Sequence, residues 1–148
     1  MTTARDIMNP EATCVFEHAN LIEAAKRMRE LGVGALPICG DDDRLVGMLT
    51  DRDIVVKAIA ADKDLSATSA GQLAQGHVYY VDVNAGVADM LAVMEKHQVR
   101  RVPVIDDHRL VGLVTEADIA RHLPDHAIVD FVKAICAPRA ITGRAQRG

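Results

Sequence analysis

Two threonine–aspartate pairs carry the side chains best suited to bind a ligand. Thr50 is followed three positions later by Asp53, and Thr115 is followed in the same way by Asp118. A carboxylate can accept two hydrogen bonds from the vicinal hydroxyls of a ribose, while a threonine hydroxyl beside it fixes the orientation. The same spacing is typical of a capping box at a helix start, although that box prefers Glu or Gln at its last position. Spacing alone favours the helix cap.

Each pair lies in a repeated phrase of eleven residues. Residues 44–54 read RLVGMLTDRDI and residues 109–119 read RLVGLVTEADI, with seven identical positions. The only nonconservative difference between the two phrases is Arg52 in the first against Ala117 in the second. The duplication predicts two strand-to-helix junctions that build two related clefts. The difference at Arg52 predicts that the clefts are unequal.

The repeat continues upstream of this phrase at an offset of 66 residues, where Pro37 corresponds to Pro103 and Val33 to Val99. Each unit spans about 55 to 60 residues, which is shorter than a typical independent domain. A unit of this size buries little apolar surface by itself. We therefore expect the two units to share one core.

Hydrophobic periodicity predicts the order β-α-β-β-α in each unit. The expected elements of the first unit are a strand at 12–16, a helix that Asn20 caps and Gly32 ends, a hairpin of strands at 35–39 and 45–49, and a helix from residue 51. Those of the second unit are a strand at 78–83, a helix at 85–97, strands at 101–105 and 110–114, and a helix from residue 116. Gly47 and Gly112 are expected to permit close backbone approach within their strands.

The predicted fold class is therefore α/β (mixed α+β), a tandem pair of β-α-β-β-α repeats with small mixed sheets and an added C-terminal helix. The expected boundaries are 6–62 for the first domain, 63–72 for a linker, 73–124 for the second domain, 125–137 for the extra helix and 138–148 for a flexible tail.

The element order, the proline in the second strand of each unit, the LVGhhTxxDI phrase and the tandem duplication together resemble the CBS-domain family, in the paired form called a Bateman module. The resemblance covers about residues 6–123. It implies a non-catalytic regulatory sensor whose two clefts accept adenosine-containing ligands such as AMP, ATP or S-adenosylmethionine. It also implies a homodimer formed through exposed apolar helix faces.

The resemblance also implies roles for individual residues. Ribose contacts would fall on Thr50 and Asp53 in one cleft and on Thr115 and Asp118 in the other. The basic side chains near the phosphates would be Arg52, Arg100 and Arg101, and adenine would lie near residues 13–15 and 79–81. The first unit contributes only Arg52 to these basic side chains, and the second unit contributes only Arg100 and Arg101. Three alternatives follow: one composite site, two clefts with different ligands, or clefts that bind no nucleotide tightly.

Cys14 and Cys39 are expected in the first and second strands of the first unit. A β-α-β crossover can place these strands side by side at about 5 Å, a separation that suits a disulfide. Tyr80 and Ile105 occupy the corresponding positions of the second unit, so the fold does not require cysteine there. A disulfide or redox-sensitive pair is one hypothesis, and small buried apolar side chains are the other.

His97 ends the first helix of the second unit and His122 lies in the second helix of that unit. If the two helices lie on the same side of the sheet, the two imidazoles could bind zinc together with a carboxylate or water. Polar surface histidines are the alternative interpretation.

The composition excludes several classes of protein. The net charge of −4 argues against a nucleic-acid binder with a broad basic face. No apolar run is long enough for a membrane span or a secretory signal, so a cytoplasmic location is expected, although export without a signal peptide stays open. No enzyme constellation is present. Beside the sensor, two other functions stay open: a metal- or redox-linked interaction protein with vestigial clefts, and a signalling partner that acts through its surface.

Overall fold

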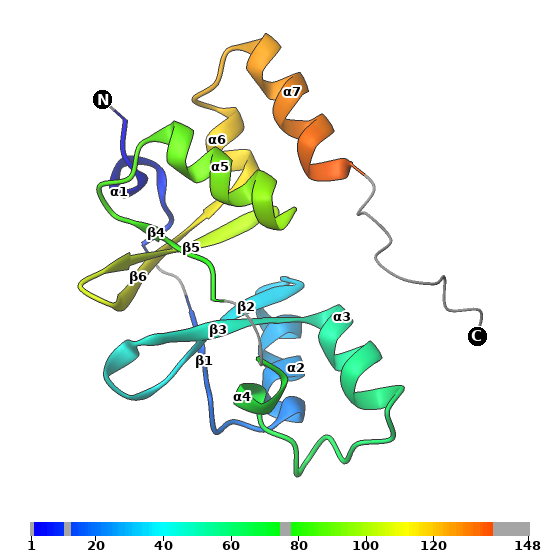
Figure 1. Cartoon of the computed structure of the whole chain (residues 1–148). Coiled ribbons are helices and arrows are strands. Elements are labelled where there is room, and N and C mark those ends of the chain that lie inside the picture. Colours follow the sequence, from blue (N-terminus) through cyan, green and yellow to red (C-terminus); the bar gives the residue numbers. More distant parts are fainter. Residues whose placement is uncertain (1, 11–12, 75–77, 138–148) are drawn as a thin grey trace.

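The computed structural model describes residues 2–10, 13–74 and 78–137 of the chain, and the tail expected at 138–148 lies outside them. It contains two units, each built on a three-stranded mixed sheet, of order β1-β2-β3 in the first and β4-β5-β6 in the second. The two sheets lie one above the other, and α7 packs on the outer side of the second unit (Figure 1). The predicted fold class is confirmed.

The first unit follows the expected order. Its elements are β1 (Val15–Phe16), α2 (Leu21–Leu31), β2 (Ala35–Cys39), the 3-10 turn η1 (Asp41–Asp43), β3 (Leu45–Thr50), α3 (Asp51–Asp53) and η2 (Ile54–Ile59). The Asn20 side chain accepts a hydrogen bond from the backbone N–H of Glu23, and Gly32 ends α2 in the left-handed conformation. The helix expected from residue 51 continues beyond α3 as a wider π-helical turn, η2.

The second unit repeats this arrangement. Its elements are β4 (Val81–Asp82), α5 (Val87–His97), β5 (Arg101–Asp106), β6 (Arg109–Thr115), α6 (Glu116–Ala120) and the added helix α7 (Asp125–Cys136). Strand β4 is shorter than the stretch expected at 78–83, because only two of its residues pair with β5. The same registers recur in both units: Ala35 pairs with Thr50 in the first, and Arg101 pairs with Thr115 in the second.

Two short helices outside the expected pattern join the units. Helix α1 (Ala4–Ile7) precedes the first unit in sequence but packs on the second, where the Ala4 N–H donates to the Ala85 carbonyl at 2.8 Å. Helix α4 (Ala70–Leu73) begins in the expected linker, ends one residue beyond it, and packs on the first unit, where the Gly71 N–H donates to the Glu17 carbonyl at 2.9 Å. Each unit is thus covered by a helix that, in sequence, lies next to the other unit.

The repeated glycine allows this crossing. A Cβ at Gly112 would lie 2.5 Å from the Met8 sulfur and 3.0 Å from the Asn9 carbonyl oxygen, and a Cβ at Gly47 would lie 3.1 Å from the Cβ of Ala74. Both strands therefore lie against the segment that follows a crossing helix. The prediction of close backbone approach at these glycines is confirmed.

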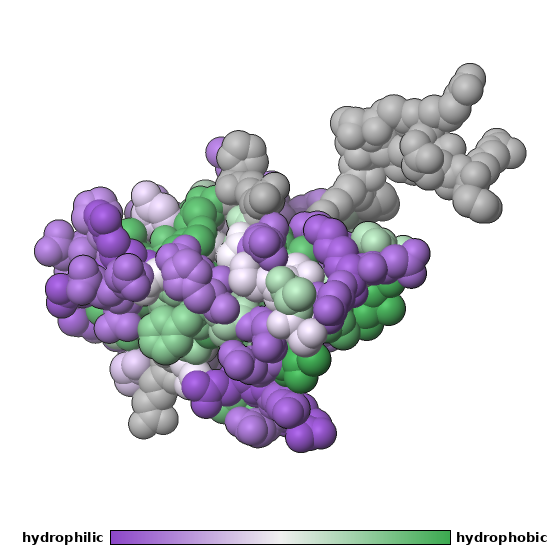
Figure 2. Space-filling view, turned by 90° about the horizontal axis from the view of Figure 1, so that it is seen from below, coloured by the Kyte–Doolittle hydropathy of each residue, from purple (hydrophilic) through white to green (hydrophobic). Residues whose placement is uncertain are grey.

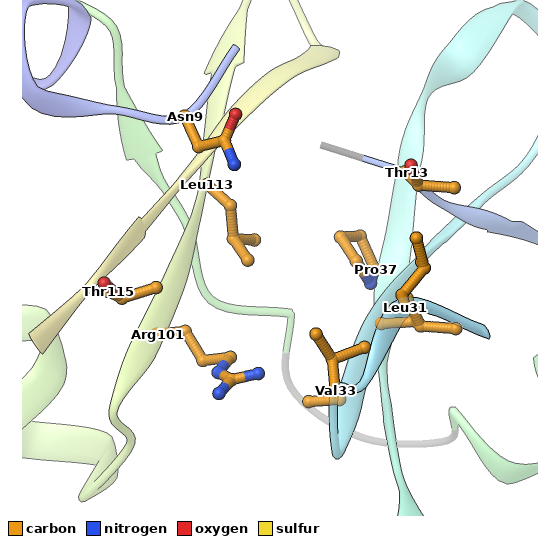
Figure 3. Close-up of a pocket in the computed structure, with 10 residues that line it drawn as sticks. Asn9, Thr13, Leu31, Val33, Pro37, Arg101, Leu113 and Thr115 are labelled. Carbon is orange, nitrogen blue, oxygen red and sulfur yellow. The ribbon is translucent and has the colours of Figure 1, made fainter. Parts of the chain in front are cut away.

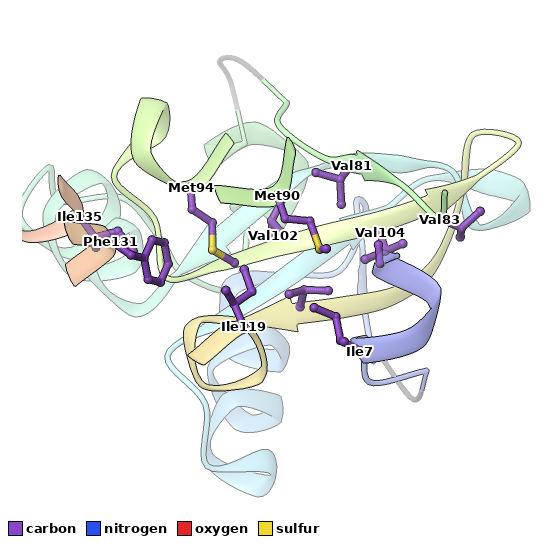
Figure 4. Close-up of a cluster of buried hydrophobic side chains, with 12 residues drawn as sticks. Ile7, Val81, Val83, Met90, Met94, Val102, Val104, Ile119, Phe131 and Ile135 are labelled. Atoms are coloured by element: carbon purple, nitrogen blue, oxygen red, sulfur yellow. The ribbon is translucent and has the colours of Figure 1, made fainter. Parts of the chain in front are cut away.

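The expectation of one shared core is wrong. The buried residues form two separate hydrophobic clusters, one around Leu21, Ile38 and Leu49 in the first unit, and one around Met90 and Val104 in the second. The second cluster is drawn in Figure 4, where Phe131 and Ile135 of α7 join it. Each sheet is covered by the helices of its own unit and by one crossing helix, so each unit closes its own core.

Candidate functional site

A cleft of about 280 Å³ lies between the two units. Its lining residues come from both units and from the N-terminal segment: Asn9, Thr13, Leu31, Val33, Ala35, Leu36, Pro37, Arg101, Leu113 and Thr115. Figure 3 shows Thr13, Val33 and Pro37 facing Arg101 and Leu113 across the opening. The apolar side comes mainly from the first unit, and the charge comes from the second.

Thr115, which lines this cleft, is bonded to Asp118 through the hydrogen bonds of a helix cap. One Asp118 carboxylate oxygen accepts from the Thr115 N–H at 2.8 Å and from its hydroxyl at 2.9 Å. The Asp118 N–H donates to the Thr115 hydroxyl oxygen at 3.3 Å. Among the residues that the structure describes, the other carboxylate oxygen contacts Arg121, at 3.5 Å, and that side chain is largely exposed. The second oxygen is therefore the one that can accept hydrogen bonds from a ligand.

Thr50 and Asp53 form the matching cap in the first unit. The Asp53 carboxylate accepts from the Thr50 N–H at 3.0 Å, and the Asp53 N–H donates to the Thr50 hydroxyl oxygen at 3.0 Å. The free carboxylate oxygen lies 3.1 Å from the Lys57 ammonium, one helical turn further on. The helix-cap interpretation of the Thr-x-x-Asp spacing is therefore confirmed in both units, and it leaves one carboxylate oxygen for other partners.

The three arginines predicted to bind phosphate occupy different parts of the structure. Arg101 extends into the cleft, toward Val33 (Figure 3). The Arg100 guanidinium instead lies 4.0 Å from the Glu116 carboxylate and 3.9 Å from the Cys136 sulfur, in a groove along α7. Arg52 is exposed on α3. Of the three, Arg101 is the one that lines the cleft beside Thr115.

Tyr79 and His97 form a pair whose contact the sequence analysis did not predict. Their rings stack with centroids 5.1 Å apart and planes inclined by 26°. Burial raises the pKa of the Tyr79 phenol, the negative charge of Asp53 raises it further, and Arg101 opposes the shift. Tyr79 therefore lies near both charged groups. The sequence signal that pointed to Tyr79 was the repeat, because the 66-residue offset relates Tyr79 to Thr13, which lines the cleft.

The two histidines considered as zinc ligands have different neighbours. His97 stacks on Tyr79, whereas the Nδ1 atom of His122 lies 2.9 Å from the carbonyl oxygen of Asp118. Within residues 2–10, 13–74 and 78–137, no group of three or more His, Cys, Asp or Glu side chains could hold a metal ion. These described residues of one chain therefore do not complete a tetrahedral zinc site, which needs four ligands.

Cys14 and Cys39 lie close enough for their thiols to interact. Strands β1 and β2 are parallel neighbours, as expected, with Phe16 opposite Cys39. Cys14 lies directly before β1 and not within the strand as expected; it is partly exposed, whereas Cys39 is buried, and no disulfide joins the two in this structure. A hydrogen bond from the Cys39 thiol lowers the pKa of Cys14 to about 7, against the opposing effect of burial, and the same bond raises the pKa of Cys39. Cys14 is thus the more readily ionised thiol.

A family profile described as "CBS domain" matches this chain twice, over residues 4–59 and 70–125. The chain belongs to the CBS-domain family. The two matches begin at the crossing helices α1 and α4, so each includes a helix that packs on the other unit. The repeat is therefore a pair of CBS domains that exchange their first helices.

Among its relatives, the CBS pair is 69% identical to Hypoxic response protein 1 of Mycobacterium tuberculosis over 141 residues, which are 95% of this chain and 99% of that protein. It is 32% identical over 120 residues to the CBS domain-containing protein YhcV of Bacillus subtilis, covering 81% and 84% of the two chains. This protein is thus a homologue of a hypoxic response protein, and the relatives match it over nearly their whole length.

Solved structures of related proteins share the fold of this chain. A crystal structure of Hypoxic Response Protein I with two coordinated zinc ions matches with a TM-score of 0.79 at 68% identity, covering 83% of this chain and all of that chain. CBSX2 in complex with AMP matches with a TM-score of 0.70 at 23% identity, covering 82% and 96%, which shows the shared fold. In the part of the chain that the structure describes, no helix is long and apolar enough to cross a membrane.

Proposed function

We propose that this CBS pair is a non-catalytic regulatory protein of a hypoxic or other stress response, and that it senses an adenosine-containing ligand in the cleft beside Thr115 and Asp118. One observation carries the proposal: a single cleft brings together an apolar wall, Arg101, and Thr115, whose helix cap holds the Asp118 carboxylate. An adenine base can contact the apolar wall, a ribose can bond to the carboxylate, and a phosphate can bond to the arginine.

Each surface suits one part of an adenosine-containing ligand. Val33 and Pro37 offer apolar contact to the base. The second Asp118 oxygen can accept hydrogen bonds from the ribose hydroxyls if Arg121, which is exposed, moves aside. Arg101 offers a planar set of donors for a phosphate. The cleft volume of about 280 Å³ lies just below the usual range of about 300–1,000 Å³ for ligand sites, so it suits one mononucleotide rather than a dinucleotide.

Ligand binding in this cleft would act on the arrangement of the two units, because its walls come from both. A ligand stabilises the arrangement in which it makes the most contacts. The protein would then report the ligand through its shape and surface, without any chemical step. This is the behaviour expected of a regulatory module.

A thermal-shift series with AMP, ATP and S-adenosylmethionine, with GMP as control, tests the proposal. A ligand at about 100 times its Kd should add roughly 2.7 kcal/mol to the free energy of unfolding. Stabilisation by an adenosine compound and not by GMP supports an adenosine sensor. No shift with any adenosine compound at millimolar concentration would contradict it.

The second candidate function is that of a metal- or redox-linked interaction protein whose clefts no longer bind nucleotide. The zinc-containing structure of its relative and the adjacent thiols of Cys14 and Cys39 support it. The described residues of one chain lack a complete zinc site, so ligands from a second copy would be needed to complete one around His97 or His122. Metal analysis of untagged protein, with His97→Ala and His122→Ala as comparisons, tests this: stoichiometric zinc lost in either variant supports the candidate.

We also propose a homodimer. Three neighbouring apolar side chains of η2 are about half exposed: Val55 at 54%, Val56 at 48% and Ile59 at 52%. Viewed from below the first unit, hydrophobic atoms come to the surface among hydrophilic ones on the side where α3 lies (Figure 2). Burying this face against a second copy would remove apolar surface from water.

A further inference from the structure

The repeat relates several residues that line the cleft beside Thr115 to residues at an equivalent position in the other half of the molecule. At the offset of 66 residues, Thr13 corresponds to Tyr79 and Leu31 to His97, and the 65-residue offset of the opening phrase relates Thr115 to Thr50. The strand registers agree, since Val15 opposite Ile38 in the first unit is repeated as Val81 opposite Val104 in the second. The position equivalent to the open cleft is therefore beside Thr50 and Asp53.

Two aromatic rings lie at the position beside Thr50 and Asp53. Thr13 and Leu31 line the open cleft, whereas their counterparts are the stacked rings of Tyr79 and His97, 5.1 Å apart. Tyr79 packs against the hydrophobic cluster of the second unit, so the stack rests on the core. The repeat therefore puts the Tyr79 phenol on the side of the Thr50–Asp53 cap, and the effect of the Asp53 charge in raising its pKa agrees.

Lys57 adds to the difference between the two positions. Its ammonium lies 3.1 Å from the Asp53 oxygen that the cap leaves free, whereas the equivalent Asp118 oxygen has Arg121 at 3.5 Å. A ribose at the second position would meet a closer cation on the carboxylate as well as the stacked rings. Two independent features thus disfavour a ligand there.

We infer that the stacked rings of Tyr79 and His97 close the cleft beside Thr50 and Asp53, so that each chain has a single nucleotide cleft, the one beside Thr115 and Asp118. This inference rests on the proposed function, because it says which of two related positions the sensor uses. Arg52, which precedes Asp53 on α3, would then take no part in phosphate binding.

Isothermal titration with AMP on the full chain tests the inference through stoichiometry. The wild type is expected to bind one AMP per chain. The double variant Tyr79→Thr, His97→Leu receives the first unit's residues at both positions and is expected to bind two. The reciprocal variant Thr13→Tyr, Leu31→His carries the rings into the open cleft and is expected to bind none.

The outcomes separate this inference from the proposed function. Two AMP molecules on the wild type, or one on the Tyr79→Thr, His97→Leu variant, would overturn the inference and leave the sensor in place. A wild type that binds no AMP contradicts the sensor for this ligand; closure of the second position by Tyr79 and His97 is then supported if that double variant gains a site and overturned if it does not. If the double variant does not fold, the reciprocal variant decides: AMP binding that survives the Thr13→Tyr, Leu31→His change overturns the inference.

Discussion

The Asp118 carboxylate accepts both the backbone N–H and the hydroxyl of Thr115, at 2.8 and 2.9 Å, through one and the same oxygen. The cap thus uses one oxygen and leaves the other to the exposed Arg121 side chain, 3.5 Å away. The two roles that the Thr-x-x-Asp spacing suggested, helix cap and ligand contact, are therefore compatible in one side chain. They can also be separated by substitution.

Asp118→Asn is expected to weaken AMP binding about tenfold or more while the fold persists. The asparagine carbonyl can still accept from the Thr115 N–H, so most of the cap remains. The charge is lost, and hydrogen bonds to charged groups are worth about 1.5–3 kcal/mol, or tenfold and above in affinity. Titration calorimetry gives the affinity and thermal unfolding gives the stability.

Asp53→Asn makes the same change in the other unit and is the matched comparison. Because Tyr79 and His97 stand at that position, Asp53→Asn should lower Tm by a similar small amount without weakening AMP binding. Equal losses of affinity in both variants would mean that both caps contact ligand, against the single-cleft arrangement.

Gly112→Ala is expected to destabilise the protein by about 1–3 kcal/mol, as overpacking of a close contact does. The new Cβ would lie 2.5 Å from the Met8 sulfur and 3.0 Å from the Asn9 carbonyl oxygen, so both the side chain and the backbone of the crossing segment must shift. Gly47→Ala meets only the Cβ of Ala74 at 3.1 Å as its nearest contact and should cost less. Urea unfolding of the two variants measures the difference, and a costlier Gly47→Ala would contradict this account.

The sequence was sufficient to predict what depends on local signals. The caps at Thr50 and Thr115, the hairpins and the end of α2 at Gly32 each follow from residue types within a few positions. The crossing helices were missed, although Thr3 to Asp6 and Ser69 to Gln72 carry the same capping-box spacing. These helices have only four residues each, so hydrophobic periodicity cannot detect them.

Long-range contacts could not be predicted from sequence. Arg100 and Arg101 are adjacent in the chain, and strand geometry sends adjacent side chains to opposite faces, but sequence alone does not say which one faces the cleft. The stack of Tyr79 on His97 joins a loop to a helix end eighteen positions away. Its position beside Asp53 follows only once the two units are placed together.

Alkylation of Cys14 is expected to depend on pH with a midpoint of about 7. The reactive form is the thiolate, and the hydrogen bond from Cys39 lowers the Cys14 pKa to about 7, so its reaction rate rises as pH increases through that value. Cys39→Ala removes the donor and should move the midpoint up, toward the ordinary thiol value of 9.0. Iodoacetamide labelling followed by mass spectrometry, in a Cys136→Ala background, measures both rates. An unchanged midpoint in Cys39→Ala would show that the two thiols do not interact.

Ile59→Glu is expected to convert the proposed dimer into a monomer. Ile59 is 52% exposed in the single chain, so the carboxylate stays in water in the monomer and the fold should persist, whereas in a dimer it would be buried among Val55 and Val56 without a partner. Light scattering after size-exclusion chromatography gives the mass, and circular dichroism verifies the fold. Val129→Glu, on the outer helix α7 where the side chain is 53% exposed, is the matched control and should stay dimeric. A dimer that survives Ile59→Glu and dissociates with Val129→Glu would move the interface from η2 to α7.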